Sequence, residues 1–249
     1  MSSGFTCETD QKGVVQLELS RAPVNALSAQ MLMSLAQRLD DMASDTNVRG
    51  VVLSSAFKVF SAGLDLKEAQ DFDLEQQHAI VRGLNEGFLA LFRFPKPVVV
   101  AIDGAAIAGG LFFVLASDYR IATSRAQLGL AEVRVGADFP VGPLEIARDT
   151  LDPNALRRLM LTGQPMKADQ ALTAGILDEL CDASDLKERA TKAAHTMAKS
   201  PQGTFASVKQ QIRGSTITRI EAAIAAGANA PEGGWFTSET RAAMQRMVG

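Results

Sequence analysis

The sequence predicts an α/β fold, in which short buried strands alternate with amphipathic helices. Apolar runs rich in β-branched residues at 48–54 and 97–102 have the composition of buried strands. Stretches with apolar residues at helical spacing follow these runs, and from about residue 154 onward the patterns are helical. Strand–helix alternation in the first ~135 residues, followed by helices alone, indicates an α/β core with a helical tail.

The first elements are visible in order along the chain. Residues 14–19 alternate apolar and polar side chains, which favours a strand at an exposed sheet edge. Ser28 is a candidate N-cap for the helix that follows, and the strand at 48–54 leads into a glycine-containing turn. Residues 74–92 predict a long amphipathic helix, which must end before two closely spaced prolines. The apolar stripe of the first helix consists of Leu32, Leu35, Leu39 and Met42.

The second half of the chain begins with the strand at 97–102. Residues 108–117 form an uncharged, apolar stretch that predicts a short and fully buried helix. Two short strands are expected at 119–123 and 127–131. Helices are then expected at 154–161, 168–174, 183–198, from Pro201 onward, and at 236–247.

Composition and charge exclude several classes of protein. The chain has 249 residues, of which 47% are hydrophobic and 21% charged, and its net charge is −3. It has no basic field to hold nucleic acid or an anionic membrane. Two distant cysteines, Cys7 and Cys181, suggest neither a disulfide framework nor a metal cluster. Because the N-terminus lacks a secretory pattern and no apolar run could span a bilayer, we expect a cytoplasmic protein.

Two glycine-centred segments carry the strongest functional signal. They are Phe60-Ser-Ala-Gly-Leu-Asp-Leu-Lys67 and Asp103-Gly-Ala-Ala-Ile-Ala-Gly-Gly-Leu-Phe112, and each follows a predicted strand. Strand-to-helix turns leave backbone N–H groups pointing outward at the positive end of a helix dipole. Two such turns side by side would aim two N–H donors at one point, as an oxyanion hole requires. The alternative is that both glycine turns serve only close helix–strand packing.

Together the two segments resemble the signatures of the crotonase superfamily, the enoyl-CoA hydratase/isomerase family. The wording Phe-Ser-Ala-Gly-Leu-Asp-Leu is most similar to the Δ3,Δ2-enoyl-CoA isomerase branch, and the resemblance extends from about Gly13 to the C-terminus. It implies a crotonase (ClpP-like) spiral of ββα units over residues 1–190. A C-terminal α-helical trimerisation region over residues 191–249 would follow, which implies a homotrimer or a hexamer.

The resemblance also implies roles for individual residues. The N–H groups of Leu64 and Gly109 would bind a thioester oxygen and stabilise the enolate that forms when an α-proton leaves. Glu132, in the segment Leu128-Gly-Leu-Ala-Glu-Val-Arg-Val-Gly136, matches the acid/base glutamate of the family. Its apolar neighbours predict a raised pKa that suits proton transfer near neutrality. The alternative is a surface glutamate paired with Arg134 or Arg148.

Phe112 is the informative departure from the family pattern. Hydratases of the family carry a second glutamate at this position, three residues beyond the oxyanion glycine, and phenylalanine cannot move a proton. The departure disfavours water addition, and we expect Phe112 and Phe113 to shape an apolar acyl pocket. Dienoyl-CoA isomerases use an aspartate two positions after Asp138. Asp138 is therefore a possible second carboxylate, although an ion pair with Arg134, four residues earlier, is the interpretation we favour.

Coenzyme A contacts are expected, by family analogy, from the backbone of Asn25, Ala26 and Ala62. Phe236 and Arg241 resemble family positions that reach an adjacent subunit's nucleotide.

Other polar residues carry no predicted catalytic role. Asp65 is expected to brace its turn. His78 and His195 lie in predicted helices and do not have the pattern of catalytic residues, and no spacing suggests a metal site.

The sequence therefore predicts an enoyl-CoA isomerase that shifts a 3-enoyl-CoA double bond to the 2-position, with Glu132 as its single acid/base. No prosthetic group is expected, because coenzyme A enters as part of the substrate. One alternative is another crotonase reaction: dienoyl-CoA isomerisation with Asp138, weak hydration, thioester hydrolysis or decarboxylation. A second alternative, from another class, is a catalytically idle acyl-CoA binder.

Overall fold

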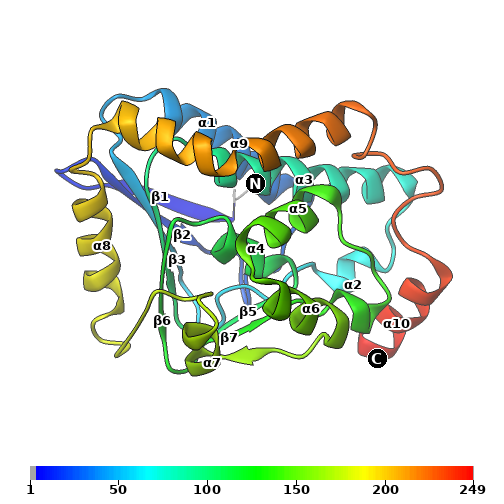
Figure 1. The fold of residues 1–249 in the computed structure, drawn as a ribbon. Helices are drawn as coiled ribbons and strands as arrows, with labels where there is room; N and C mark the ends of the chain where they lie inside the picture. Colours follow the sequence, from blue (N-terminus) through cyan, green and yellow to red (C-terminus); the bar gives the residue numbers. More distant parts are fainter. Residues whose placement is uncertain (1–3, 249) are drawn as a thin grey trace.

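A six-stranded and a three-stranded β-sheet, surrounded by helices, make up the computed structural model, which describes residues 4–248 (Figure 1). The strands are β1 (Phe5–Thr9), β2 (Val14–Leu19), β3 (Gly50–Ser55), β4 (Val98–Ile102), β5 (Ala105–Ile107), β6 (Tyr119–Thr123), β7 (Gln127–Gly129), β8 (Met166–Lys167) and β9 (Glu179–Cys181). The helices are α1 (Ala29–Ser44), α2 (Leu66–Ala69), α3 (Leu74–Arg93), α4 (Gly109–Leu115), η1 (Glu132–Val135), α5 (Val141–Thr150), α6 (Pro153–Thr162), α7 (Ala168–Thr173), α8 (Leu186–Met197), α9 (Gln202–Ala225) and α10 (Ser238–Val248).

The large sheet has the strand order β1-β2-β3-β4-β6-β9. Only β1 and β2 pair antiparallel, and every other neighbouring pair in this sheet is parallel. The small sheet has the order β5-β7-β8. The chain passes from the large sheet to the small one directly after β4 and returns in β6. The strand–helix alternation predicted from the sequence is therefore confirmed as an α/β fold.

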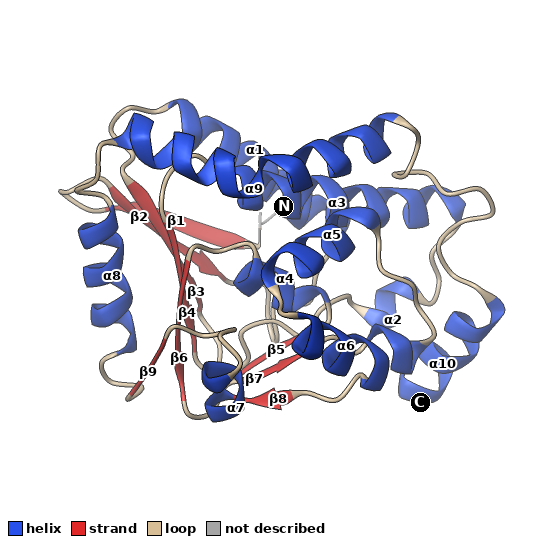
Figure 2. Cartoon of the chain, viewed as in Figure 1, coloured by secondary structure: helices blue, strands red, loops and turns tan. Residues whose placement is uncertain are grey.

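Helices cover both faces of the large sheet (Figure 2). On one face α8 packs against β2, β3, β4 and β6, and a small apolar cluster fills the contact. The main core lies on the other face, where α1 and α3 pack against each other and α9 packs against α3 and α5. Alternation in β2 fits these two layers, because Val14 belongs to the α8 cluster while Val15 and Leu17 belong to the main core.

Two expectations about the strands were wrong. Residues 14–19 do not form the sheet edge, because β1 pairs with β2 on its outer side and four of the six residues of β2 are buried. Strands also continue beyond residue 135, as β8 and β9 show. These strands have only two and three residues, which is too short for an alternating pattern to be recognised. For the same reason β5 was not expected within the second glycine segment.

The predicted helices are confirmed to within a few residues at their ends, while α5 and the short η1 were not predicted. Ser28 caps α1 by accepting a hydrogen bond from the backbone N–H of Met31. Every residue of α4 is buried, as its uncharged sequence predicted. The helix α8 runs through residue 190, where we expected the core to end, and Ala190 is buried against the large sheet.

Within the described part of the chain, no helix combines the length and the hydropathy that a membrane span requires. Cys7 and Cys181 are both free and half-buried.

Candidate active site

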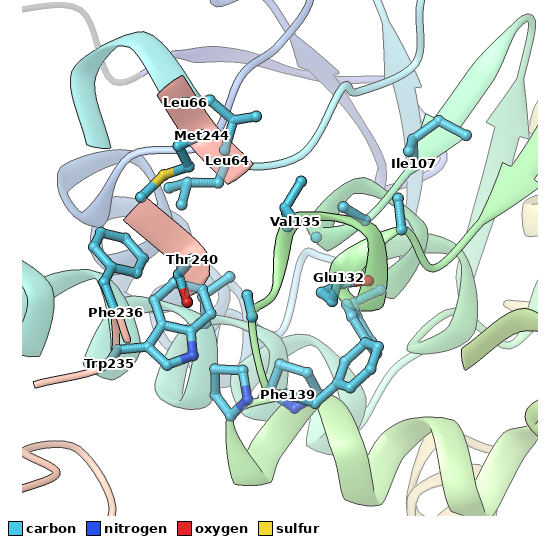
Figure 3. A pocket seen from close by; sticks show the side chains of 18 of the residues that line it. Leu64, Leu66, Ile107, Glu132, Val135, Phe139, Trp235, Phe236, Thr240 and Met244 are labelled. Carbon is cyan, nitrogen blue, oxygen red and sulfur yellow. The ribbon is translucent and has the colours of Figure 1, made fainter. Parts of the chain in front are cut away.

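A mostly apolar pocket opens where the two glycine segments, η1 and the segment before and within α10 meet (Figure 3). Its cavity volume is about 130 Å³. The pocket is lined by Ala62, Leu64, Leu66, Leu84, Ile107, Ala108, Gly109, Phe112, Ala131, Glu132, Val135, Ala137, Phe139, Pro140, Pro143, Trp235, Phe236, Thr240 and Met244. Among these lining residues Glu132 is the only ionisable one.

The two glycine segments are in direct contact at this pocket. Gly63 has a φ of +82°, and a Cβ atom at this position would lie 2.8 Å from the Cβ of Ala108 and 3.2 Å from the nitrogen of Gly109. A Cβ atom on Gly110 would lie 2.5 Å from the carbonyl oxygen of Ser61. Glycine is therefore required at both positions by the close approach of the two backbones.

The contact brings two unpaired backbone donors together. Neither Leu64 N–H nor Gly109 N–H donates a hydrogen bond to any other described residue, although their neighbours do. Ala108 N–H donates to Gly129 O at 2.7 Å and Asp65 N–H donates to Leu27 O at 3.4 Å. Gly109 is the first residue of α4, whose opening N–H groups have no partner within the helix. Two unpaired donors on segments in contact are what an oxyanion hole requires.

Ala108 adopts a strained conformation between the two donors. Its φ is +50° and its ψ −129°, a region that residues with a side chain rarely occupy. Non-glycine residues in such regions cluster at active sites, where the surrounding structure holds them.

Glu132 begins η1, three residues after Gly129, the last position of β7, which pairs with Ile107 of β5. Glu132 is only 8% exposed, and its Oε2 atom is buried without a hydrogen-bond partner. Burial raises the pKa of Glu132 from 4.5 to about 7, and a hydrogen bond from the backbone opposes this only partly. The carboxyl group is thus balanced between its two protonation states near neutrality.

The alternative interpretation of Glu132 as a surface ion-pair partner is wrong. Arg148 instead donates to Glu145 at 2.7 Å. Arg134 is exposed, and its side chain packs next to Gly163, where a Cβ atom would lie 2.6 Å from Arg134 Cγ. Neither arginine forms an ion pair with Glu132, and neither lines the pocket.

The two phenylalanines of α4 have different positions. Phe112 lines the pocket, and its ring meets that of Phe139 edge to face with centroids 6.4 Å apart. Phe113 points away into the core, where it is fully buried and packs edge to face on Phe60 and Phe88. Placing Phe113 in the acyl pocket was therefore wrong, because successive residues of a helix point in directions about 100° apart.

Asp138 lies beside the pocket without lining it. Its side chain is exposed, and the expected ion pair with Arg134 does not form. Its backbone carbonyl instead accepts a hydrogen bond from Trp235 Nε1 at 3.0 Å.

The predicted coenzyme A residues divide into two groups. Ala62 is exposed and lines the pocket. Asn25 is fully buried with a φ of +49°, and its side-chain amide donates to Ser55 Oγ at 2.8 Å and to Phe60 O at 2.9 Å. The carbonyl of Ala26 accepts a hydrogen bond from Arg21. Asn25 therefore helps to hold the first glycine segment in place, and neither Asn25 nor Ala26 lines the pocket.

Asp65 braces its turn, as predicted, by capping α2 and forming an ion pair with Arg21. His78 contacts the carbonyl of Pro231, and His195 pairs with Asp10, so both histidines lie outside the pocket.

Sequence reasoning missed most of the wall that the C-terminal segment contributes. Phe236 lines the pocket of its own chain, where we had expected it to reach an adjacent subunit. Trp235, Thr240 and Met244 line the same wall and were not predicted. The only signals in the sequence are the single tryptophan of the chain and the polar residues before α10.

Fold and site together define an acyl-transforming enzyme of the crotonase type, with two backbone donors and one buried carboxyl group. The sequence model of the enoyl-CoA hydratase/isomerase family matches residues 9–242. A Bacillus subtilis protein named as a probable enoyl-CoA hydratase is 31% identical over 216 residues, which cover 85% of this chain and 83% of the relative.

Two solved structures extend this similarity. Human mitochondrial Δ3-Δ2-enoyl-CoA isomerase superposes with a TM-score of 0.88 and 26% identity, covering 98% of this chain and 96% of the human one. Mycobacterium tuberculosis EchA3, called a probable enoyl-CoA hydratase, superposes with a TM-score of 0.82 and 30% identity, covering 90% of this chain and 95% of EchA3. The chain described here belongs to the enoyl-CoA hydratase/isomerase family and is an enzyme of that family.

Proposed function

We propose that the protein is an enoyl-CoA isomerase that moves the double bond of a 3-enoyl-CoA to the 2-position. One observation carries the proposal: the pocket holds a single ionisable side chain, Glu132, and presents phenylalanine at position 112. The family includes both hydratases and isomerases, so the choice between them rests on this site.

The reaction needs an enolate, because an α-proton of a thioester is too weakly acidic to be lost unassisted. In the proposed mechanism Leu64 N–H and Gly109 N–H bind the thioester oxygen. Each such donor typically contributes about 3–4 kcal/mol to transition-state stabilisation. The contact between the two glycine segments supports this role, because it holds both donors on a rigid backbone before substrate arrives.

Glu132 then acts twice in one turnover. Its carboxylate takes a proton from C2, and the electron pair of that C–H bond moves to form the dienolate on the thioester oxygen. The protonated carboxyl returns the proton to C4, the oxygen regains its carbonyl bond, and the double bond now joins C2 and C3. No water is consumed and the enzyme is regenerated. A carboxyl group with a pKa of about 7 suits both directions of transfer.

The acyl chain of the substrate would occupy the apolar pocket beside Phe112 and Phe139, and coenzyme A would pass Ala62. Placing the nucleotide beyond Ala62 follows the family and rests on the exposure of this residue at the pocket rim. We further propose a cytoplasmic homotrimer, or a hexamer of two trimers.

A direct test is proton NMR of the purified protein with 3-enoyl-CoA in D2O, with Glu132→Gln as the inactive control. Conversion to 2-enoyl-CoA is expected, and the variant should be slower by about 10²–10⁴-fold. Hydration of 2-enoyl-CoA at a rate comparable to isomerisation would contradict the proposal. Deuterium exchange at C2 without migration would retain the enolate site and indicate another crotonase reaction.

A further inference from the structure

Three hydrogen-bonding side chains fasten residues 235–244, which we call the C-terminal wall, to the rest of the site. Gln77 of α3 is 3% exposed, and its Oε1 accepts hydrogen bonds from the backbone N–H groups of Trp235 and Phe236, each at 3.0 Å. Trp235 donates to the carbonyl of Asp138. Thr240 donates from its hydroxyl to the carbonyl of Gly136 at 2.5 Å. The wall is therefore tied both to α3 and to the residues that follow Glu132.

Of these three side chains, Thr240 makes the contact nearest to Glu132. Gly136 N–H donates to the carbonyl of Glu132, as the cap of η1, and Ala137 N–H donates to the same carbonyl at 3.1 Å. Thr240 thus holds the end of the one-turn helix that begins with Glu132. Figure 3 shows the side chains of Thr240 and Glu132 on opposite sides of the same pocket, with Val135 of η1 between them in this view.

The Thr240 hydroxyl donates to the Gly136 carbonyl, because a carbonyl oxygen can only accept. Thr240 is 1% exposed, and its Oγ1 accepts a hydrogen bond from the backbone N–H of Thr237 at 3.2 Å. The Thr237 hydroxyl lies 3.1 Å away and in turn accepts from Thr240 N–H. With its proton given to Gly136, the Thr240 oxygen can accept from both the backbone N–H and the hydroxyl of Thr237. The contacts with Thr237 at the start of α10 therefore orient the Thr240 hydroxyl toward the Gly136 carbonyl.

Gly136 is shaped to receive α10. Its φ is +63°, and a Cβ atom at this position would lie 3.1 Å from the carbonyl carbon of Glu239 and 3.2 Å from the nitrogen of Thr240. Any side chain at residue 136 would push α10 away from η1. The backbone of the catalytic turn and the backbone of α10 are thus in contact at the residue that Thr240 binds.

We propose that Thr240 is a positioning residue for Glu132: its hydroxyl fixes the turn 132–136 against α10 and so holds the carboxyl group in the pocket, away from water. This inference rests on the proposed function, in which Glu132 is the acid/base. Thr240 acts through Gly136 and does not itself transfer a proton.

Charged groups on the surrounding elements do not provide another control of Glu132. Those on η1, on the loop that follows it and on the packed helices α6 and α10 are all exposed, and none lines the pocket. They are Arg134, Asp138, Arg157, Arg158, Glu239, Arg241 and Arg246. The protonation of Glu132 therefore depends on its burial, and Thr240 acts on Glu132 by maintaining that burial.

The test measures the titration of Glu132 directly, by carbon NMR of protein labelled at the glutamate carboxyl carbon. The Glu132 signal is assigned as the one that Glu132→Gln removes. Thr240→Val keeps the shape of the side chain but removes the hydroxyl, so water should reach Glu132 and its pKa should fall by about one unit. Thr240→Ser restores the donor and should titrate like the parent.

Thr196→Val is the matched control, because it removes an exposed threonine hydroxyl that bonds a helix carbonyl on the distant α8. It should leave the titration unchanged. With 3-enoyl-CoA, kcat of Thr240→Val should fall at least about tenfold with little change in KM, because the misplaced base acts after binding. Should Thr240→Val not fold, Thr240→Cys replaces it, since a thiol is a weak donor.

An unchanged pKa and kcat in a folded Thr240→Val protein would overturn the inference. The titration also separates this result from failure of the proposed reaction. If no variant isomerises 3-enoyl-CoA but Glu132 titrates lower in Thr240→Val, the positioning role stands and the reaction is wrong. If the parent and Thr240→Val isomerise 3-enoyl-CoA at the same rate, Thr240 has no positioning role.

Discussion

The pocket and the junction of α9 with the large sheet both bury ionisable groups, but only the groups at the junction have partners of opposite charge. In the pocket Glu132 is buried among apolar side chains with no charged partner. At the junction of α9 with the large sheet, Asp118 is 10% exposed and lies 2.8 Å from Lys209 Nζ and 3.1 Å from the Arg213 guanidinium. Burial lowers the pKa of Lys209 to about 8, although Asp118 opposes the shift.

The presence or absence of a charged partner distinguishes a buried ion pair that stabilises the fold from a buried carboxyl group that can exchange a proton. Asp118 also accepts a hydrogen bond from Val98 N–H, and Arg213 donates to the carbonyls of Phe92, Ala116 and Ser117. Lys209 and Arg213 share Asp118 as their partner, and these ion pairs join α9 to the core. Glu132 is left without a partner, and the cost of its burial keeps it ready to exchange a proton.

The largest stability effect is expected at the paired junction. Asp118→Asn removes the carboxylate between Lys209 and Arg213, and leaving buried cations unpaired typically costs about 3–5 kcal/mol. Denaturant unfolding should show this loss in the free energy of unfolding. The double variant Asp118→Asn/Lys209→Met should recover part of it, because one unpaired cation is gone.

Asp40→Asn is the control for the junction, since it breaks an exposed ion pair with Arg93 and should cost less than about 1 kcal/mol. Equal losses for the Asp40 and Asp118 variants would remove the distinction between the two kinds of pair.

A smaller effect of opposite sign is expected at Glu132. Its folded-state pKa of about 7 lies above the ordinary value of 4.5, so the neutral acid stabilises the fold below pH 4.5. This stability is lost as pH rises to 7. Glu132→Gln cannot ionise, so its free energy of unfolding should match that of the parent in acid and exceed it by about 3 kcal/mol above pH 7.

Paired unfolding curves from pH 4 to pH 8 would measure this difference. Glu239→Gln, which replaces an exposed glutamate, should show no such pH-dependent gain. A Glu132→Gln protein that is less stable than the parent at pH 8 would mean that the carboxylate has a stabilising partner after all.

The smallest effect is expected for Asp138, an exposed carboxylate next to the pocket. Asp138→Asn leaves the backbone carbonyl that Trp235 binds. The activation free energy for turnover of 3-enoyl-CoA and the free energy of unfolding should therefore each change by less than about 0.5 kcal/mol. Loss of most activity would instead make Asp138 a second catalytic carboxylate and favour dienoyl-CoA isomerisation. Steady-state kinetics of the two variants, Asp138→Asn and Glu132→Gln, place the carboxylates on one scale.

The sequence predicted the elements whose patterns are long enough to read. The helix α3 and the strand β4 were found because they have 20 residues of helical periodicity and five consecutive buried apolar residues. Strands β5, β8 and β9, with two or three residues each, exist because neighbouring strands pair with them, and local sequence holds no record of that pairing.

The site was predictable where its chemistry is local and unpredictable where it depends on distant packing. Glu132 was found with the glycine segments because each lies within a recognisable motif. The role of Thr240 depends on α10 folding back onto Gly136, 104 residues earlier, and no local pattern encodes that contact. Phe113 was misplaced because every residue of α4 is buried, so burial alone does not show which side chain faces the pocket.

The C-terminal wall is also the last part of the pocket to be synthesised. At a translation rate of about 5–20 residues per second, the 104 residues between Gly136 and Thr240 take roughly 5–20 s to synthesise. During this interval a nascent chain already holds both glycine segments and Glu132, while the residues that close the pocket are still missing. The Glu132 carboxyl is then not yet enclosed, so under the proposed mechanism the chain gains its buried acid/base only when the last helix docks.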